Sequence, residues 1–290
     1  MELPTDLQFS QASLQDFVDC PRRFYLRYIL RVAWPAVAAE PLEEHERHVQ
    51  LGSAFHRLVQ QHLLGLPEAL LARIATDPDL ERWWRNYVVY RPAEMLPDAP
   101  AADASKRYPE VTVTAALAER RLLAKYDLVV VQPGLQAPGS RAFIFDWKTS
   151  PKQTKSVTLR GRLQTRVYRY LLTRAGAHLN DGQAFDPAQI EMIYWFAEHP
   201  EAPVRLPYDA AQYHDDEVYL TGLVEQILSL DEDAFLPTED ERRCAYCPYR
   251  SYCDRGVKAG ALSDDEAETV EDIAELRVGF DFEQIAEIAF

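Results

Sequence analysis

The order of the expected helices and strands predicts a mixed α/β fold, in which helices flank a central mixed sheet and a helical region precedes it. Helical patterns fill the first third of the chain. Two apolar, β-branched segments, 121–132 and 142–148, then flank a loop rich in Pro and Gly. A helix, a strand and a further helix follow. The 290 residues, 47% of them hydrophobic, suffice for a sizeable core.

Six helices are expected. Residues 10–30 favour two short helices, the second of which begins at Pro21, because proline is well tolerated in the first turn of a helix. Apolar residues at helical spacing predict the others, which are expected at 49–65, 78–89, 157–175 and 210–230.

Four strands are expected, at 110–117, 121–132, 141–148 and 189–197. The second and third are predicted to pair as a hairpin, because the segment 133–140 between them has the Pro and Gly residues of a short loop. A second loop is expected at 96–105, which is rich in Pro, Ala and Asp.

The N-terminal residues MELPTDLQFS lack the basic start and apolar run of a signal peptide. No segment approaches the run of about 18 apolar residues that spans a membrane. We therefore expect a cytoplasmic protein with no membrane partner. Two parts are expected along the chain: one folded domain over residues 1–258, and an acidic C-terminal tail over residues 259–290.

The net charge of −15 argues at first against a nucleic-acid partner, but the charge is unevenly distributed. Residues 147–180 contain eight Lys and Arg and no Asp or Glu, whereas acidic residues concentrate in 231–241 and 263–275. A basic segment of this kind is either a solvated helix face or the binding surface for an anion. There is no GxxxxGK[ST] loop, so nothing indicates a nucleotide-driven motor.

The segment AFIFDWK (142–148) ends a buried strand with two charged residues, Asp146 and Lys148. Such charges are costly unless they are paired or functional. Asp127, in the partner strand, would bring a second carboxylate to the same place. Two neighbouring carboxylates repel unless a cation such as Mg²⁺ or Mn²⁺ shares them, and the Trp147 carbonyl would add a third oxygen ligand.

Lys148 is expected on the same face of the strand as Asp146, because side chains of a strand repeat every two residues. From there its ammonium group would orient or deprotonate the attacking water and offset the charge of a phosphate. The arrangement predicts metal-assisted hydrolysis of phosphodiester bonds. The alternative is that Asp146 and Lys148 form an ordinary surface ion pair.

These residues resemble the PD-(D/E)xK nuclease superfamily, and specifically its RecB-like branch, over most of the chain. Asp127 takes the place of the first acid of the family motif, and Asp146 with Lys148 takes the place of its (D/E)xK part. The resemblance implies a restriction-endonuclease-like core in which Asp127 and Asp146 hold the metal and Lys148 is catalytic.

Two further motifs carry the resemblance. GSAFH (52–56) is similar to the helical Gly-x-x-x-His of the family, which makes His56 a candidate metal ligand. QTRVY (164–168) matches its Gln-x-x-x-Tyr, whose two members lie one helical turn apart on one face. The resemblance implies that Gln164 and Tyr168 lie beside the active site and contact the substrate. The chain has Ala124 and Val129 where the family often has Gly and Arg around the first acid.

The chain has four cysteines, three of which form a C-x2-C-x5-C pattern while the fourth lies more than two hundred residues upstream: Cys244, Cys247, Cys253 and Cys20. Their number suits either a tetrahedral zinc or a [4Fe–4S] cluster, and their spacing does not choose between them. Disulfides are disfavoured in a cytoplasmic protein.

The cysteines also resemble those of iron–sulfur RecB-like nucleases, including AddB-type helicase–nuclease subunits and CRISPR-associated spacer-processing nucleases. One cysteine precedes the nuclease core in these proteins and three follow it. The resemblance implies a structural [4Fe–4S] cluster, bound by a C-terminal segment, that joins both ends of the chain and closes a very long loop.

The resemblance implies a Mg²⁺- or Mn²⁺-dependent deoxyribonuclease that acts in DNA repair or recombination. An exonuclease on single-stranded or frayed duplex ends is the expected form, with the arginines of 160–174 approaching the DNA strand. Three alternatives remain open: a CRISPR spacer-processing nuclease with an adaptation partner, a non-catalytic DNA-binding subunit with a helicase partner, and an interaction protein stabilised by zinc.

Overall fold

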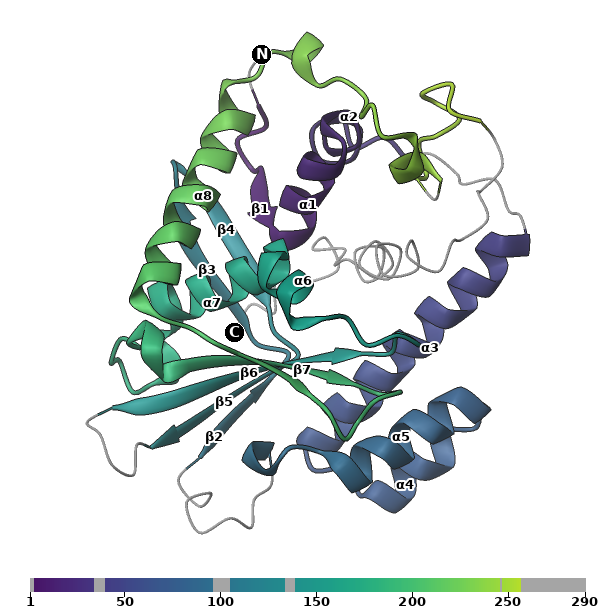
Figure 1. The fold of residues 1–290 in the computed structure, drawn as a ribbon, viewed down its shortest axis with the longest axis vertical. Coiled ribbons are helices and arrows are strands. Elements are labelled where there is room, and N and C mark those ends of the chain that lie inside the picture. Colours follow the sequence, from purple (N-terminus) through teal and green to yellow (C-terminus); the bar gives the residue numbers. More distant parts are fainter. Residues whose placement is uncertain (1–2, 34–39, 96–104, 134–138, 246, 257–290) are drawn as a thin grey trace, which may run out of the picture.

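The computed structural model describes residues 3–33, 40–95, 105–133, 139–245 and 247–256. Within these ranges the chain forms a three-stranded sheet, β1–β4–β3, and a five-stranded sheet, β2–β5–β6–β7–β8, with helices around both (Figure 1). The expected mixed α/β fold with flanking helices is confirmed, although two sheets take the place of one. The expected acidic tail, 259–290, lies outside the described residues.

Both sheets are mixed, because β1 pairs in parallel with β4 and β6 with β7, whereas the other neighbours are antiparallel. The predicted hairpin is present as β5 and β6. The strands are β1 (Gln8–Ser10), β2 (Lys106–Pro109), β3 (Thr112–Leu117), β4 (Arg120–Lys125), β5 (Leu128–Pro133), β6 (Ser140–Lys148), β7 (Ile190–Phe196) and β8 (Val204–Pro207).

The segment predicted as one strand at 121–132 is interrupted at Tyr126 and Asp127. Its first half, β4, belongs to the smaller sheet and its second half, β5, to the larger one. Opposite the interruption, Glu110 has a positive φ of 55° and its N–H donates to the Asp127 carbonyl (3.0 Å). The change of sheet therefore takes place where the first acid of the motif lies.

All six expected helices are present, and α4 is an addition. The helices are α1 (Gln11–Asp19), α2 (Pro21–Phe24), which continues as a π-helical turn η1 (Tyr25–Ile29), α3 (Glu40–Leu63), α4 (Glu68–Ile74), α5 (Pro78–Tyr90), α6 (Ser156–Gly161), α7 (Leu163–Ala175) and α8 (Ala210–Ser229). The helix predicted at 157–175 is divided into α6 and α7, because Arg162 between them has an extended ψ of 140°. None of the described helices is both long and apolar enough to cross a membrane.

The five-stranded sheet is buried on both faces, which explains why β5 and β6 read as continuous apolar runs. Val129 and Ile144 belong to a core with α1, α7 and α8, whereas Val130 and Phe145 face a second core with α3, α4 and α5. Figure 1 shows α3, α4 and α5 gathered on one side of this sheet, away from α1 and α8. The carboxyl end of β6 therefore lies between two packed layers.

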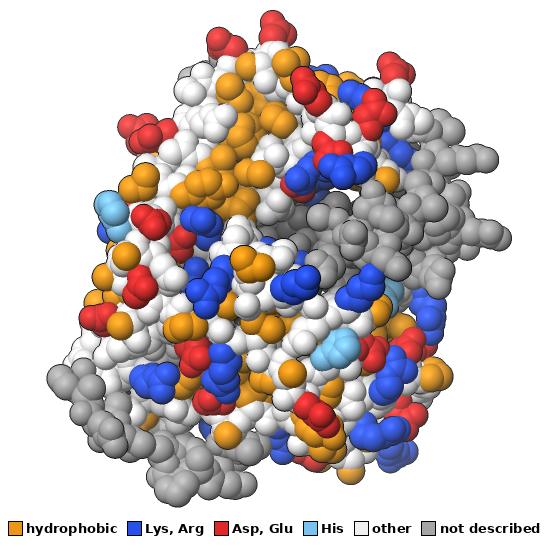
Figure 2. Space-filling view, viewed as in Figure 1, with side chains coloured by type: hydrophobic (Ala, Val, Ile, Leu, Met, Phe, Trp, Pro, Cys, Tyr) orange, Lys and Arg blue, Asp and Glu red, His pale blue; other side chains and the backbone are white. Residues whose placement is uncertain are grey.

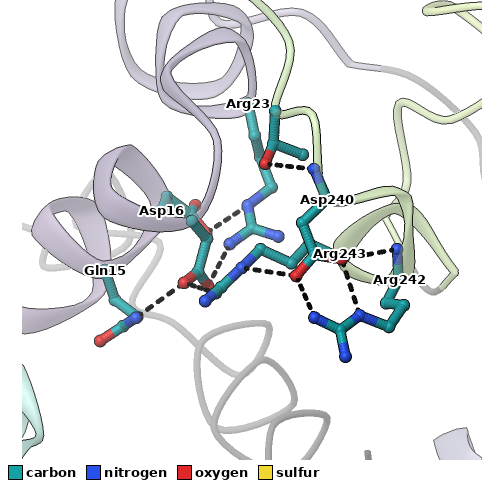
Figure 3. A network of polar contacts seen from close by, with 8 residues as sticks. Gln15, Asp16, Arg23, Asp240, Arg242 and Arg243 are labelled. Atoms are coloured by element: carbon teal, nitrogen blue, oxygen red, sulfur yellow. Dashed lines mark hydrogen bonds and ion pairs between the residues drawn. The ribbon is translucent and has the colours of Figure 1, made fainter.

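Both ends of the described chain meet in a cluster that we call the terminal junction (residues 16–32 and 236–255). Tyr249 packs against Leu26, and its hydroxyl donates to the Val32 carbonyl (3.0 Å). Arg243 forms an ion pair with Asp19. Figure 3 shows how the polar side chains of α1 and α2 face those of residues 240–243. Side-chain contacts thus join the C-terminal segment to the N-terminal helices, whereas the expected cluster between them stays a prediction.

Candidate active site

The hairpin of β5 and β6 brings Asp127 and Asp146 together. Leu128 is paired with Phe145, so continuing this antiparallel register by one residue places Asp127 opposite Asp146. Side chains that lie opposite each other in an antiparallel pair are on the same face. The Trp147 N–H donates to Asp127 Oδ2 (2.9 Å), which fixes this carboxylate against the end of β6.

His56 reaches the same place from α3. Its Nδ1 lies 3.3 Å from Asp127 Oδ1, and its Nε2 lies 3.1 Å from the Trp147 carbonyl oxygen. Both neighbours accept hydrogen bonds, so only the doubly protonated ring satisfies both contacts. Gly52, one turn earlier, lets α3 approach closely, since a Cβ there would lie 3.1 Å from Thr149 Oγ1. The glycine of the Gly-x-x-x-His motif thus allows the close packing of α3 that brings His56 to Asp127.

Asp146, Lys148 and Gln164 form a buried polar triad. Lys148 Nζ lies 3.0 Å from Asp146 Oδ2 and 3.2 Å from Gln164 Oε1. Gln164 Nε2 donates to Asp146 Oδ1 (2.7 Å), which also fixes which way its amide points. The expected placement of Lys148 beside Asp146 is confirmed, and Gln164 from α7 joins them. The ring of Trp147 points away into the second core, so only its backbone faces this site.

Two residues that the sequence did not single out, Thr165 and Tyr194, lie next to the triad. Tyr194 contacts Gln164, and Thr165 contacts Tyr194. Thr165 Oγ1 donates its one proton to the Leu159 carbonyl (2.6 Å), so its contact with Tyr194 (2.7 Å) requires the tyrosine hydroxyl to donate. Lys148 Nζ lies 5.7 Å from the Tyr194 ring centroid. In β7, Tyr194 is directly paired with Asp146, which no local motif reveals.

Tyr168 is buried, close enough to Asp146 and Asp127 to be influenced by their charges. Burial raises the pKa of its hydroxyl well above the usual value, and the negative charges of Asp146 and Asp127 raise it further. Tyr168 therefore remains a protonated hydrogen-bond donor at any physiological pH. Its ring packs on Tyr126 at a centroid distance of 4.8 Å, and the Tyr126 hydroxyl donates to the Tyr168 carbonyl (2.9 Å).

A third acid, Glu110, adds to the negative charge around Asp127. Burial and the charge of Asp127 raise the pKa of Glu110, against the effect of its ion pair with Lys125. Burial also acts to raise the pKa of Asp127, but the neighbouring His56 outweighs it and leaves that pKa below the usual value. Contacts with His56, the Trp147 N–H and Lys148 thus favour the ionised form of Asp127.

Within the part of the chain that the structure describes, no group of three or more His, Cys, Asp or Glu side chains is arranged as a metal site. Around Asp127 the donors are two such side chains and one backbone carbonyl: His56 and Asp127 with the oxygen of Trp147. Carboxylate and carbonyl oxygens with an imidazole nitrogen suit Mg²⁺ or Mn²⁺. The donor chemistry thus fits the expected divalent cation.

The basic residues of 147–180 do not all face outward. Lys152, Lys155 and Arg160 are exposed, but Arg169 is buried with only 3% of its surface accessible. The carboxylate of Asp216, in α8, lies 2.9 Å from Arg166 Nη1 and 3.7 Å from Arg169 Nη2. The expectation that Arg169 approaches the DNA was wrong, because its side chain is buried beside an acid of a distant helix.

All four cysteines are free thiols, and all lie in the terminal junction. Cys20 lies between α1 and α2, where the Thr238 N–H approaches its sulfur at 3.4 Å. Burial raises the pKa of Cys244, and nearby Cys20 and Cys253 raise it further. Burial also raises the pKa of Cys247, against the opposing charge of Arg23, and Cys20 and Cys244 add to the rise. The sulfurs are thus close enough to influence one another, although they do not form a metal-ligand group.

A family model described as the PD-(D/E)XK nuclease superfamily matches residues 8–254. The chain belongs to this superfamily. It is therefore a nuclease, which hydrolyses phosphodiester bonds of nucleic acid. A crystal structure from Eubacterium rectale, described as a candidate exonuclease, has the same fold with a TM-score of 0.50 and 11% sequence identity, over 95% of this chain and 94% of that chain. No curated protein sequence matches the chain.

Proposed function

We propose that this nuclease is a Mg²⁺- or Mn²⁺-dependent deoxyribonuclease of the RecB-like branch that acts as an exonuclease on single-stranded or frayed DNA ends. One observation carries the proposal. At the end of β6, the His56 ring lies 3.3 Å from Asp127 Oδ1 and 3.1 Å from the Trp147 carbonyl oxygen. The buried triad of Asp146, Lys148 and Gln164 begins on the same strand. DNA repair or recombination in the cytoplasm is the proposed setting.

In this proposal Asp127, Asp146, His56 and the Trp147 carbonyl hold the divalent cation. When bound there, the cation would supply Lewis-acid activation of the scissile phosphate and a hydroxide nucleophile at neutral pH. Lys148 keeps its ammonium group beside Asp146, where it offsets the charge that develops on the phosphate oxygens.

Gln164 and Tyr168 set the position of these groups. Gln164 holds Asp146 and Lys148 at a fixed separation through two hydrogen bonds. Tyr168 retains its proton and so presents a donor beside the carboxylates. Lys152, Lys155 and Arg160 are exposed on the segment that follows β6, where the backbone of a DNA strand would be attracted.

The test uses end-labelled single-stranded and duplex DNA with the purified full-length chain in Mg²⁺ or Mn²⁺. Stepwise shortening from an end is expected, together with its loss in Asp146→Asn. Asp215→Asn, an exposed acid on α8, is the matched control and should cleave normally. Accumulation of internal fragments from circular DNA would replace the exonuclease mode with an endonuclease. No cleavage by the wild-type chain would favour a non-catalytic DNA-binding subunit that needs a helicase partner.

We propose further that Cys20, Cys244, Cys247 and Cys253 bind one [4Fe–4S] cluster that strengthens the terminal junction. The nearness of these thiols supports a shared centre, and the charge of Arg23 acts against the rise that burial causes in the pKa of Cys247. A single zinc fits the same ligands.

Metal analysis of anaerobically purified protein tests the cysteine centre. About four irons per chain and broad absorbance near about 400 nm are expected for a Cys₄ cluster. Cys20→Ser should lose as much iron as Cys253→Ser, since all four thiolates complete one site. One zinc per colourless chain would refute the cluster, and full iron content in Cys20→Ser would remove Cys20 from it.

A further inference from the structure

A row of basic side chains adjoins the active site. Lys152, Lys155 and Arg160 are exposed and Arg162 is half-buried, and we call these four the basic strip. Figure 2 shows Lys and Arg side chains across the middle of this face, over α6 and the start of α7. The charge of Arg162 acts on the ionisation of Tyr194, which lies against Gln164. Arg162 also lies only two residues before Gln164 in the sequence, so the basic strip adjoins the triad.

The basic strip differs from the basic residues next to it in the sequence. Arg166 and Arg169 share the one carboxylate of Asp216 (2.9 and 3.7 Å), and Arg174 faces Glu217 (3.6 Å). For Lys155 and Arg160 no ion pair with a described carboxylate is found. Residues 147–180 contain no acid of their own, so Lys155 and Arg160 keep a positive charge at this surface of a strongly acidic chain.

The acidic tail (259–290) has the complementary composition. It contains ten Asp and Glu and one Arg, so it carries −9 of the net charge of −15. Its acids alternate with large apolar residues, among them Val270, Ile273 and Leu276. The basic strip likewise surrounds an apolar side chain, Val157, which is 73% exposed. The acidic tail and the basic strip thus have opposite charges, and each also offers apolar side chains.

We propose that the acidic tail docks on the basic strip and competes there with DNA. The described chain ends at Gly256, only a few residues before the tail. A tethered segment acts at an effective concentration of about millimolar, so weak ionic contacts suffice to keep the strip occupied. The docking itself does not depend on the proposed nuclease function, whereas the competition with DNA rests on it.

The docking is tested by zero-length carbodiimide cross-linking of the full chain, followed by mass spectrometry. Cross-links are expected from Lys152 or Lys155 to acids of 264–275. Lys106, which is exposed but paired with Asp181, is the internal control and should not join the tail. Equal labelling of all exposed lysines, or no cross-link to Lys152 or Lys155, would overturn the proposal.

The competition is tested by neutralising three acids of the tail in the full chain: Asp264→Asn, Asp265→Asn and Glu266→Gln. The matched control neutralises three exposed acids elsewhere, Glu119→Gln, Asp215→Asn and Glu225→Gln, and changes the net charge equally. Binding of a labelled single-stranded oligonucleotide is measured without divalent cation. The tail variant should bind about 3- to 10-fold more tightly than wild type at low salt, because the open fraction of the strip rises.

The control variant should gain clearly less affinity, and the difference between the two variants should shrink at high salt, where ionic contacts are screened. Equal gains in both variants would show an effect of net charge alone and would refute the competition. The cross-linking and the DNA-binding experiments test the two proposals separately. Cross-links in a chain that binds no DNA would support the docking and would refute the proposal that the substrate is DNA. Tighter binding without cross-links would refute docking on the strip.

Discussion

The terminal junction and the active site both bury carboxylates, but they balance the charge in opposite ways. In the junction, Asp16 and Asp19 are contacted by three arginines: Arg23, Arg27 and Arg243. The positive charge is permanent, since a guanidinium is not deprotonated in a protein. The charges of Asp16 and Asp19 are therefore balanced by groups that keep their protons at every physiological pH.

In the active site the charges balance only while His56 is doubly protonated. Three carboxylates, Glu110, Asp127 and Asp146, face two lysines and a histidine, of which His56 is the only group that can release its proton near neutral pH. A mobile cation can replace such a proton, whereas it cannot replace a buried arginine. A charge network closed by arginines within the chain therefore stabilises the fold, whereas one that depends on the proton of a histidine can exchange that proton for a metal ion.

The largest expected effect on stability is in the junction. Arg23→Met should lower the free energy of unfolding by about 3–5 kcal/mol, because it leaves Asp16 and Asp19 buried without their main partner. Urea denaturation measures the change. Arg27→Met is the control, since Arg27 is 26% exposed and its loss should cost clearly less. Equal costs would show that burial does not distinguish the two arginines.

The matching change in the active site should affect activity more than stability. Lys148→Met should lower the rate of cleavage by at least about 10²-fold, since it removes the charge that faces the phosphate. Stability should fall less than in Arg23→Met, because Gln164 still donates to Asp146. Initial rates and denaturation of the same preparation give both values. A variant with wild-type rates would remove Lys148 from the chemistry.

Divalent cations should stabilise the active site and leave the junction unchanged. Mn²⁺ at about 100 times its Kd should add about 2.7 kcal/mol to the free energy of unfolding, and Asp127→Asn should lose most of this gain. His56 must release its proton to bind the cation, so Mn²⁺ affinity should rise with pH through the titration of the histidine. Calorimetric titration in two buffers of different ionisation heat detects the proton. No proton release would contradict the role of His56.

The smallest expected effects are the pH dependences of two neighbouring acids, which should have opposite signs. The pKa of Asp127 is lowered, so its contribution to stability is present above its ordinary pKa of about 4 and is lost as pH falls through the folded value. The pKa of Glu110 is raised, so stability falls as pH rises from its ordinary value through the folded one.

Denaturation of Asp127→Asn and Glu110→Gln between about pH 3 and pH 7 measures the two signs. Relative to wild type, Asp127→Asn should lose less stability on acidification. Glu110→Gln should lose less stability as pH rises from about 4 to 7. The same slope change in both variants would contradict the opposed environments of the two carboxylates.

Much of the site followed from the sequence, because local spacing fixes which side chains share a face. The alternation of a strand places Asp146 and Lys148 together, and helical spacing places Gln164 and Tyr168 together. The hairpin brings Asp127 opposite Asp146 for the same reason. The apolar patterns likewise determined the helices and the longer strands. The short strands β1, β2 and β8 and the helix α4 were missed, since three to seven residues give too little periodicity.

Only the tertiary structure decided which charges remain available. Arg169 belongs to the same basic segment as Lys155, yet it is buried beside Asp216 of α8. Tyr194 completes the environment of Lys148 only because β7 pairs in parallel with β6. The break at Asp127, likewise, arises where one chain segment passes between two sheets. The sequence thus determined the chemical groups and their local faces, but pairing across long separations is set by packing of the whole chain, which no local period records.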